Sequence, residues 1–296
     1  MTGDTLGIGD LARRTGVPVR TIRFYCDEGL LTSARSAGGH RRFDPAQVHR
    51  LNLVRRMRGL GLSLNSIADV LAGERSLVEA AAAERAALDR EVTTLAWRRA
   101  ALRAVEEAPP ADRAARLELL YAVTDGSAGH EALVRLWHPM VTGTVPPDTA
   151  DMFLAVSAPQ PPELPTPAQV VAYAELVLLA ADRAFAARLR TSTLVTRLGA
   201  LHDGVGAACE LASPQVAAGA RPEPGPALDL FAAAHAAASG TGDTPEFRGV
   251  LRRRTAADRH PQVRRYWHLA GEITGEAVPV GVAHTWLLDA LDRSAG

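Results

Sequence analysis

Residues 19–31, VRTIRFYCDEGLL, combine side chains suited to binding nucleic acid. Arg20 and Arg23 are three positions apart, so a helix would place them on one face. Arginine donates hydrogen bonds in pairs and fits both phosphate oxygens and the edge of guanine. The hydroxyl groups of Thr21 and Tyr25 can donate to phosphate. The stretch predicts a helix that presents these side chains to DNA, although on these residues alone an ordinary amphipathic surface helix is the alternative.

The other reactive side chains form no recognisable catalytic or metal-binding motif. The sequence contains no HExxH, CxxC, P-loop or GxSxG pattern. Its two cysteines, Cys26 and Cys209, are too few for a disulfide framework, and neither has the nearby thiol that redox sensing needs. We therefore expect no enzyme activity, no cofactor and no metal site. Two pairs of histidines are eight residues apart, too far to chelate one ion: His130 with His138, and His260 with His268.

The arginine-rich stretch follows a short helix and a glycine. Residues 8–15 carry apolar side chains at helical spacing and precede Gly16, which favours the end of a helix. Pro18 suits the first turn of a second helix, which Gly29 ends. Two short helices joined around a glycine are typical of a helix-turn-helix. In this arrangement Ile22 would face the core, and the Gly-Leu-Leu sequence would turn the chain inward.

A hairpin and two more helices are predicted next. In SARSAGGHRRF (33–43) two adjacent glycines stand between short flanks, which indicates a tight turn. The far flank presents His40, Arg41 and Arg42. Apolar residues at helical spacing then predict a helix, and Ser63 would cap another. The start of the first of these helices is indicated by an N-cap acid, a proline and a glutamine: Asp44, Pro45 and Gln47.

Residues 6–73 resemble the DNA-binding domain of the MerR family of transcriptional regulators. Three stretches carry the resemblance in order: IGDLARRTGVPVRTIRFYCDEGLL, GGHRRFDPAQV and RRMRGLGLSLNSIADVL. It implies a winged helix-turn-helix, whose second helix enters the major groove while the hairpin wing contacts flanking backbone. His40, which we include among the wing contacts, stands where the family usually has Tyr, and we interpret Cys26 as a small filler. The resemblance implies the following DNA contacts: Arg20, Thr21, Arg23 and Tyr25 on the helix, and Arg41 and Arg42 on the wing.

Charge is distributed unevenly along the 296 residues. Residues 1–75 contain 12 Arg and 7 acidic residues, a net charge of +5, whereas residues 76–296 contain 21 Arg and 26 acidic residues, a net charge of −5. A basic head on an acidic body is expected of a nucleic-acid-binding module joined to another domain. The N-terminus lacks the apolar segment of a signal peptide, and the longest apolar run, 170–187, contains charged residues. We therefore expect a cytoplasmic protein that does not contact membranes.

Residues 76–108 are expected to form a dimerisation helix. Strong helix formers dominate this segment, and it contains no Gly. One alternative is an amphipathic helix that packs on its own domain. The resemblance instead implies an antiparallel coiled coil between two copies, so that a homodimer faces a pseudo-palindromic site. The seam is indicated by leucines at intervals of seven and by valines at companion positions: Leu88, Leu95 and Leu102, with Val78 and Val92.

Residues 111–296 are predicted to form an all-α body without a functional motif. Two Pro-rich segments, 157–167 and 212–226, are predicted loops, and the first would separate a small subdomain from a larger one. Helices are predicted near 112–124, 128–141, 167–190, 192–211, 226–238, 245–256, 261–274 and 280–293.

The body is expected to bind a small-molecule effector, because the domain at this place in the family usually acts as a sensor. Such pockets are mostly apolar and aromatic, with a few polar groups. The mixed segment 264–268 is the first place to look. Each aromatic residue of the body is either a core residue or a member of such a pocket, and the candidates are Trp137, Tyr173, Phe231, Tyr266, Trp267 and Trp286.

These features predict a mostly α-helical chain with three parts: a DNA-binding domain (1–75), a coiled-coil helix (76–108) and the body (111–296). The resemblance implies a homodimeric regulator of double-stranded promoter DNA. It would act on RNA polymerase indirectly, by bending and untwisting an overlong promoter spacer when an unknown effector binds. The alternative is a body that sequesters a toxic small molecule or binds a protein partner, with regulation secondary.

Overall fold

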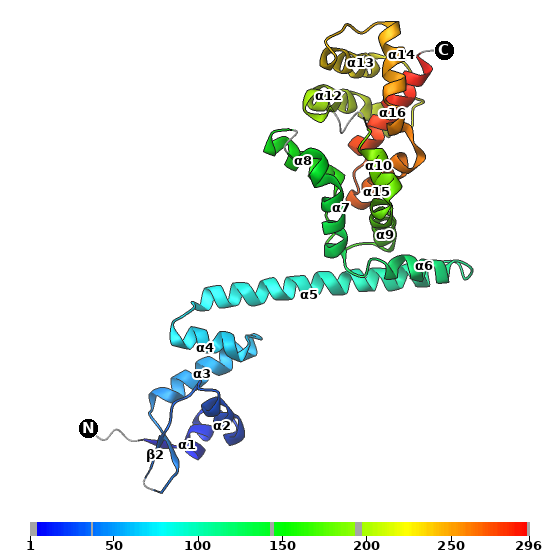
Figure 1. Cartoon of the computed structure of the whole chain (residues 1–296). Helices are drawn as coiled ribbons and strands as arrows, with labels where there is room; N and C mark the ends of the chain where they lie inside the picture. The colour runs from blue at the N-terminus through cyan, green and yellow to red at the C-terminus, as the bar shows by residue number, and fades with distance from the viewer. Residues whose placement is uncertain (1–4, 37, 143–144, 193–196, 295–296) are drawn as a thin grey trace. The chain divides into compact units, whose positions relative to one another are not determined.

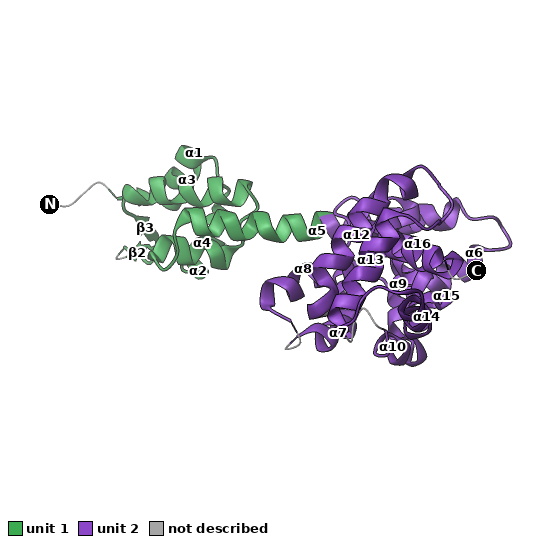
Figure 2. Ribbon diagram, turned by 90° about the horizontal axis from the view of Figure 1, so that it is seen from above, with its two compact units in different colours: residues 1–92 green, residues 93–296 purple. Residues whose placement is uncertain are grey.

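The computed structural model describes residues 5–36, 38–142, 145–192 and 197–294. The chain divides into two compact units, residues 1–92 and residues 93–296 (Figure 2). Nearly all of the described regular structure is helical, and one small sheet lies near the N-terminus (Figure 1). The predicted fold class, dominated by α-helices with a β-hairpin wing, is therefore confirmed. None of the described helices is long and apolar enough to cross a membrane.

The first unit contains the predicted helix-turn-helix. Gly16 ends the first helix with a φ of 68°, a left-handed conformation that costs a glycine little. After the second helix the backbone N–H groups of Leu30 and Leu31 both bond to the carbonyl of Tyr25, so the chain turns inward and buries both leucines. The elements of this region are β1 (Leu6–Gly7), α1 (Ile8–Thr15), α2 (Val19–Asp27), β2 (Ala34–Arg35), β3 (Arg41–Phe43), α3 (Ala46–Gly59) and α4 (Leu64–Ala72).

Three short strands form one antiparallel sheet in the order β1-β3-β2. Strands β2 and β3 make the predicted hairpin, with Ala34 opposite Arg42 and Arg35 opposite Arg41. Side chains alternate along a strand, so the fully buried Phe43 fixes which face of β3 is exposed. Arg42 lies on the opposite face from Phe43 and is exposed, whereas Arg41 is half-buried.

Helix α3 begins one residue later than predicted. Its first residue is Ala46, and the Asp44 carboxylate still accepts a hydrogen bond from the Ala46 N–H at 2.8 Å. Gln47 does not complete a capping box; its side-chain oxygen accepts instead from the backbone N–H of Thr32 at 3.2 Å. Ser63 caps α4 as predicted, accepting from the Ser66 N–H.

Helix α5 (Leu77–Glu106) contributes residues to both units. In the first unit, Ala80 is buried in a core with residues of α3 and α4. In the second unit, Trp97, Ala100 and Ala104 are buried against other helices of that unit. The apolar residues of the predicted seam point elsewhere and are exposed, with exposed fractions of 49–78%: Val78, Leu88, Val92, Leu95 and Leu102.

The remaining named elements of the second unit, within its described residues, are all helices. The predicted boundaries of three of its helices, 226–238, 261–274 and 280–293, coincide with those observed. In chain order the helices are α6 (Arg113–Tyr121), α7 (Gly126–Val141), α8 (Pro147–Ser157), α9 (Pro167–Ala181), α10 (Arg183–Leu189), α12 (Leu198–Ala217), α13 (Pro226–Ala238), α14 (Pro245–Arg254), the short 3₁₀ helix η1 (Ala257–Arg259), α15 (Pro261–Thr274) and α16 (Val280–Arg293).

Three predictions for the body were wrong in detail. Helix α8 was not predicted, although it begins with a proline at its first position. The predicted helix 167–190 is two helices, because the Asp182 side chain accepts from the Ala184 N–H and starts α10. Helix α12 continues to Ala217 through Pro214, so the first part of the predicted loop 212–226, residues 212–217, is helical. Part of the predicted helix 192–211, residues 193–196, lies outside the described residues.

The second unit buries two clusters of apolar residues. One is rich in aromatic side chains and is formed by residues from α5 to α10 together with α15. The other is formed mainly by α12, α13 and α16. Helices α7 and α9 pack against each other in the first cluster. The segment 157–167 between α8 and α9 therefore joins helices of one cluster and does not separate two subdomains.

Candidate nucleic-acid interface

Helix α2 has one buried face and one exposed face. Ile22 is fully buried in a cluster with Leu11 of α1 and Leu51 of α3, which fixes the rotation of the helix. Arg20 and Arg23 are exposed on the other side, as predicted from their spacing. No residue that the structure describes forms an ion pair with either of these two arginines. Both guanidinium groups are thus available to phosphate or to the edges of bases.

The other two residues predicted on α2 are less accessible. Thr21 and Tyr25 are both half-buried. The Tyr25 side chain packs against both apolar clusters of the first unit, and its ring lies 5.9 Å from that of Phe24. Tyr25 therefore supports the position of α2 whatever its hydroxyl group contacts. The exposed ring of Phe24 was not among the predicted contacts.

The two arginines of the wing hairpin differ in their surroundings. Arg42 is exposed, as is His40. Arg41 turns back to α2, where its Nη2 lies 2.7 Å from Asp27 Oδ1 and its Nη1 donates to the Arg23 carbonyl at 3.3 Å. The hydrogen bond that Arg41 donates to the Asp27 carboxylate raises the pKa of Arg41. Arg41 thus ties the wing to the C-terminal end of α2, a contact that the sequence did not indicate.

Recognition-helix and wing residues meet around one hollow of about 450 Å³. Arg23 of α2 and Arg41 of β3 both line it. Its other basic residues come from the wing: Arg35, His40 and Arg42. The arginines around this concave surface attract anions. The phosphate backbone of DNA carries the opposite, negative charge. Arg35 was missed by the sequence reasoning, although it directly opposes Arg41 across the hairpin.

Three other arginines of the first unit, all in α3, have a structural role. Each donates to a backbone carbonyl at 2.7 Å: Arg50 Nε to Leu30, Arg55 Nη1 to Thr15 and Arg58 Nη1 to Leu62. These bonds hold the ends of α1, α2 and α3 itself. The first unit therefore contains two kinds of arginine: those that stabilise the fold and those that are exposed to solvent.

The aromatic residues predicted for an effector pocket lie mostly in the core. Trp137, Tyr173, Phe231 and Tyr266 are essentially inaccessible. The Trp137 Nε1 donates to the Tyr266 hydroxyl at 2.6 Å, and that hydroxyl donates to the Ser157 carbonyl. Two candidates line a cavity within the described part of the chain. Trp267 lines a pocket of about 420 Å³, and Trp286 lines one of about 220 Å³, where it also donates to the Ala220 carbonyl.

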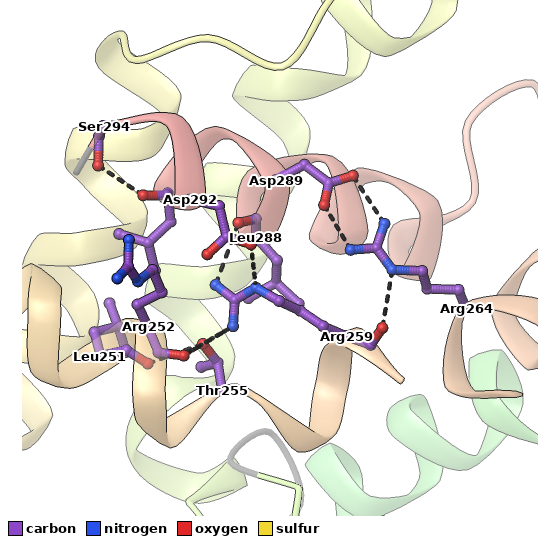
Figure 3. Close-up of polar contacts among 10 residues, drawn as sticks. Leu251, Arg252, Thr255, Arg259, Arg264, Leu288, Asp289, Asp292 and Ser294 are labelled. Carbon is purple, nitrogen blue, oxygen red and sulfur yellow. Dashed lines mark hydrogen bonds and ion pairs between the residues drawn. The ribbon is translucent and has the colours of Figure 1, made fainter. Parts of the chain in front are cut away.

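The charged part of the segment 264–268 holds helices together. Arg264 forms a two-pronged ion pair with Asp289 of α16, with N–O distances of 2.8 and 2.5 Å (Figure 3). Arg259 of η1 lies 2.9 Å from Asp292 and donates to the Thr255 hydroxyl (Figure 3). These arginines tie α15 and η1 to α16, whereas Trp267 of the same segment lines the pocket of about 420 Å³.

Two short helices, a turn and a β-hairpin wing with a shared basic surface define a winged helix-turn-helix DNA-binding domain. Residues 6–74 match the family model described as MerR HTH family regulatory protein, and residues 48–108 match the model described as MerR, DNA binding. Residues 6–108 are therefore a MerR-type helix-turn-helix region of the chain. No solved structure matches the chain.

Three relatives each align with about a quarter of the chain. The chain is 45% identical over 73 residues to Nodulation protein NolA of Bradyrhizobium elkanii, which is 24% of this chain and 33% of that protein. It is 39% identical over 67 residues to HTH-type transcriptional regulator HmrR of Rhizobium leguminosarum bv. viciae, 23% of this chain and 52% of that protein. It is 42% identical over 69 residues to the mercuric resistance operon regulatory protein of Serratia marcescens, 23% of this chain and 48% of that protein. The match thus spans a third to about half of these relatives.

Proposed function

We propose that the protein is a homodimeric transcriptional regulator that binds a pseudo-palindromic promoter site. The observation that carries the proposal is the basic hollow shared by α2 and the wing. Exposed Arg20 and Arg23 would contact base edges or phosphates in the major groove, and Arg42 and His40 would contact flanking phosphates. We assign the DNA-binding role to residues 1–75, the dimerisation role to residues 76–108 and an effector-binding role to residues 111–296.

The dimer is supported by the exposed apolar residues of α5. Monomeric proteins rarely expose a regular row of large apolar side chains, because covering it is favourable. Leu88, Leu95 and Leu102 follow each other at intervals of seven residues and are exposed in the single chain. A second copy of the same helix would cover them, and two DNA-binding heads would then match a two-fold symmetric site.

The regulator would act through the shape of the DNA. In this mechanism the effector-bound dimer bends and untwists an overlong spacer, so that the promoter elements on each side come into phase for RNA polymerase. The effector must then bind the DNA-distorting state more tightly than the resting state. The body supports this role with an apolar pocket of a size suited to a small molecule.

DNase I footprinting on the DNA upstream of the protein's own gene tests the proposal. We expect a protected near-palindrome with hypersensitive bands at its centre, and a changed pattern when extract of the producing organism is added. The variant Arg23→Ala should lose protection, whereas Arg253→Ala, which removes an exposed arginine of α14, should keep it. Failure to select any preferred sequence from a random DNA library would overturn the DNA-binding proposal.

The same pocket also supports a second candidate function, in which the body sequesters a toxic small molecule. The two functions differ in dose response. A sensor changes transcription at effector concentrations set by its affinity, independent of the amount of protein. A sequestering protein protects cells in proportion to its own concentration, so titrating protein expression against toxicity would separate the two.

A further inference from the structure

The pocket of about 420 Å³ lies entirely within the second unit. Its walls come from α8, α12, α15 and the start of α16, four elements that are far apart in the sequence. Ligand pockets in proteins typically measure roughly 300–1,000 Å³, so this one is large enough for a compact organic molecule. The side chains of its wall define what kind of molecule that is.

The floor of the pocket is aromatic. Trp267 and Phe153 both line it and are nearly buried, with 6% and 8% of their surfaces exposed. Trp267 packs directly on the backbone of α16 at Gly281, because a Cβ at that position would lie 2.4 Å from the indole ring. The glycine therefore lets the indole lie flat against the helix at the edge of the cavity. An indole ring beside a cavity offers an apolar contact and a negative π face.

His284 is an unpartnered polar group at the same wall. It lines the pocket, is only 5% exposed, and its side chain forms no hydrogen bond with any residue that the structure describes. Its ring contacts Phe231, with 5.6 Å between the ring centres. Buried polar groups almost always have a hydrogen-bond partner, so a histidine without one beside a cavity indicates a place for a polar atom of a ligand. Burial lowers the pKa of His284 to about 3, so the ring is neutral and adds no positive charge.

The mouth of the pocket is acidic. Asp203 and Glu210 of α12 line it, and their spacing of seven residues places them on one face of the helix, about 10 Å apart. Neither carboxylate is ion-paired within the described residues, and none of the described lining residues is an arginine. Elsewhere in this unit acidic residues do pair with arginine, as in Asp243 with Arg248 and Asp289 with Arg264. The two unpaired carboxylates make the mouth favourable for a cation.

We propose that this pocket binds an organic cation with an aromatic body. The aromatic part of the ligand rests on Trp267 and Phe153, its charge lies at the mouth near Asp203 and Glu210, and a polar atom meets His284. The inference rests on the effector-binding role proposed above for the body, and it names the chemical class of the effector.

Fluorescence binding titrations of the full-length protein without DNA test the proposal. The probes are three aromatic cations of increasing size, thioflavin T, ethidium and rhodamine 6G, and one aromatic anion, 1-anilinonaphthalene-8-sulfonate. At least one cation should bind saturably with one site per chain. The double variant Asp203→Asn with Glu210→Gln should weaken binding of that cation at least tenfold without weakening binding of the anion. The control, Asp112→Asn with Glu118→Gln, removes two exposed acids of or beside α6 and should change neither.

A blocking variant establishes that the probe occupies this pocket. Ala207 is exposed at the mouth, so Ala207→Trp should fill the entrance without disturbing the fold, and cation binding should be lost. Binding that survives Ala207→Trp, binding unaffected by the loss of both acids, or absence of binding by all three cations would each overturn the proposal. Selection from a random DNA library with the same protein separates the failures. A preferred DNA sequence without cation binding refutes only the ligand class, whereas failure to select any preferred sequence refutes the regulator.

Discussion

Arg23 stands where the recognition helix α2 meets the hollow beside the wing. It is exposed, lines that hollow and has no ion-pair partner in the described part of the chain. We expect Arg23→Ala to weaken binding to the preferred site by about 1–3 kcal/mol and to reduce sequence preference, because a contact to a base edge is lost. Competition binding with matched and scrambled sites measures both effects. An unchanged preference would assign Arg23 to phosphate alone.

Removing either of two wing arginines, Arg41 or Arg42, is expected to change DNA binding in a different way. Arg42 is exposed, so Arg42→Ala should lower the dependence of log affinity on log salt by about one, as expected for one lost phosphate contact. Arg41 is bound to Asp27, so Arg41→Ala should weaken binding to all sequences by loosening the wing, with a smaller change in salt dependence. Affinity measured at several salt concentrations distinguishes the two.

Asp27→Ala provides the control for this pair. If Arg41 acts by holding the wing, removing Asp27 should weaken binding as Arg41→Ala does, although it removes a negative charge next to DNA. Stronger binding by the Asp27→Ala variant would contradict the positioning role and would restore Arg41 as a phosphate contact released from its partner.

His235 and His284 make the stability of the second unit depend on pH. Burial lowers the pKa of His235 to about 4 and that of His284 to about 3, and both rings contact Phe231. Below pH 6.5 the unfolded chain takes up protons that the folded chain excludes. The free energy of unfolding should therefore fall as the pH falls from about 6.5 towards about 4, by at most about 1.4 kcal/mol per pH unit for each histidine.

Urea unfolding at pH 7.5 and pH 5.5 measures this effect. His235→Leu should reduce the loss of stability at pH 5.5, because one of the two buried titrating groups is gone. At pH 7.5 the same change should cost little, since the buried Nε2 of His235 has no hydrogen-bond partner in the described structure. His138→Leu, which removes an exposed histidine of α7, should leave the pH dependence unchanged. Equal pH dependence in both variants would rule out the buried pair as its source.

At the scale of elements, α5 is the feature on which assembly depends. Leu95 is 54% exposed on this helix, so Leu95→Asp should leave each chain folded but place a charge in the proposed seam. We expect a monomer in sedimentation velocity at concentrations where the native protein is dimeric. Leu164→Asp changes an even more exposed leucine outside α5 and should remain dimeric. A dimer that survives Leu95→Asp would exclude this seam.

Helix ends were predictable wherever glycine or proline determines the backbone. Gly16 and the start of α15 at Pro261 agree with the sequence pattern because the local conformation decides them. The break at Asp182 was missed, since Asp182 lies within a continuous apolar run and acts as a cap only through its side chain. Pro214 had the opposite effect on the prediction: it indicated a loop, whereas packing keeps α12 helical through this residue.

The candidate DNA-binding site was predictable only in part, because some of its contacts depend on residues that are far apart in the sequence. The exposure of Arg20 and Arg23 follows from helical spacing, a local property. The Arg41–Asp27 contact joins residues 14 positions apart, and its geometry depends on how the hairpin folds back on α2. The pocket of the body draws on elements from α8 to α16, so its acidic mouth could not be found by searching for aromatic residues along the chain.

At the scale of the whole molecule, the two units should unfold separately. Each has its own buried clusters, so calorimetry of the full-length protein should show two transitions. Site-specific DNA should raise the melting temperature of one transition, and a ligand of the body should raise that of the other, because a ligand stabilises the unit that it binds. A single transition that both ligands shift equally would mean that the units unfold as one.

The hydrogen bonds made by the arginines of α3 limit how the sequence of the first unit can change during evolution. Arg50, Arg55 and Arg58 each hold a backbone carbonyl, at Leu30, Thr15 and Leu62. Every amino acid supplies that carbonyl, so the side chains at the accepting positions are free to drift without losing the bond. The arginines themselves have no such freedom. Related sequences should therefore keep the donors without any correlated partner, and methods that infer contacts from covarying positions will not detect these three bonds.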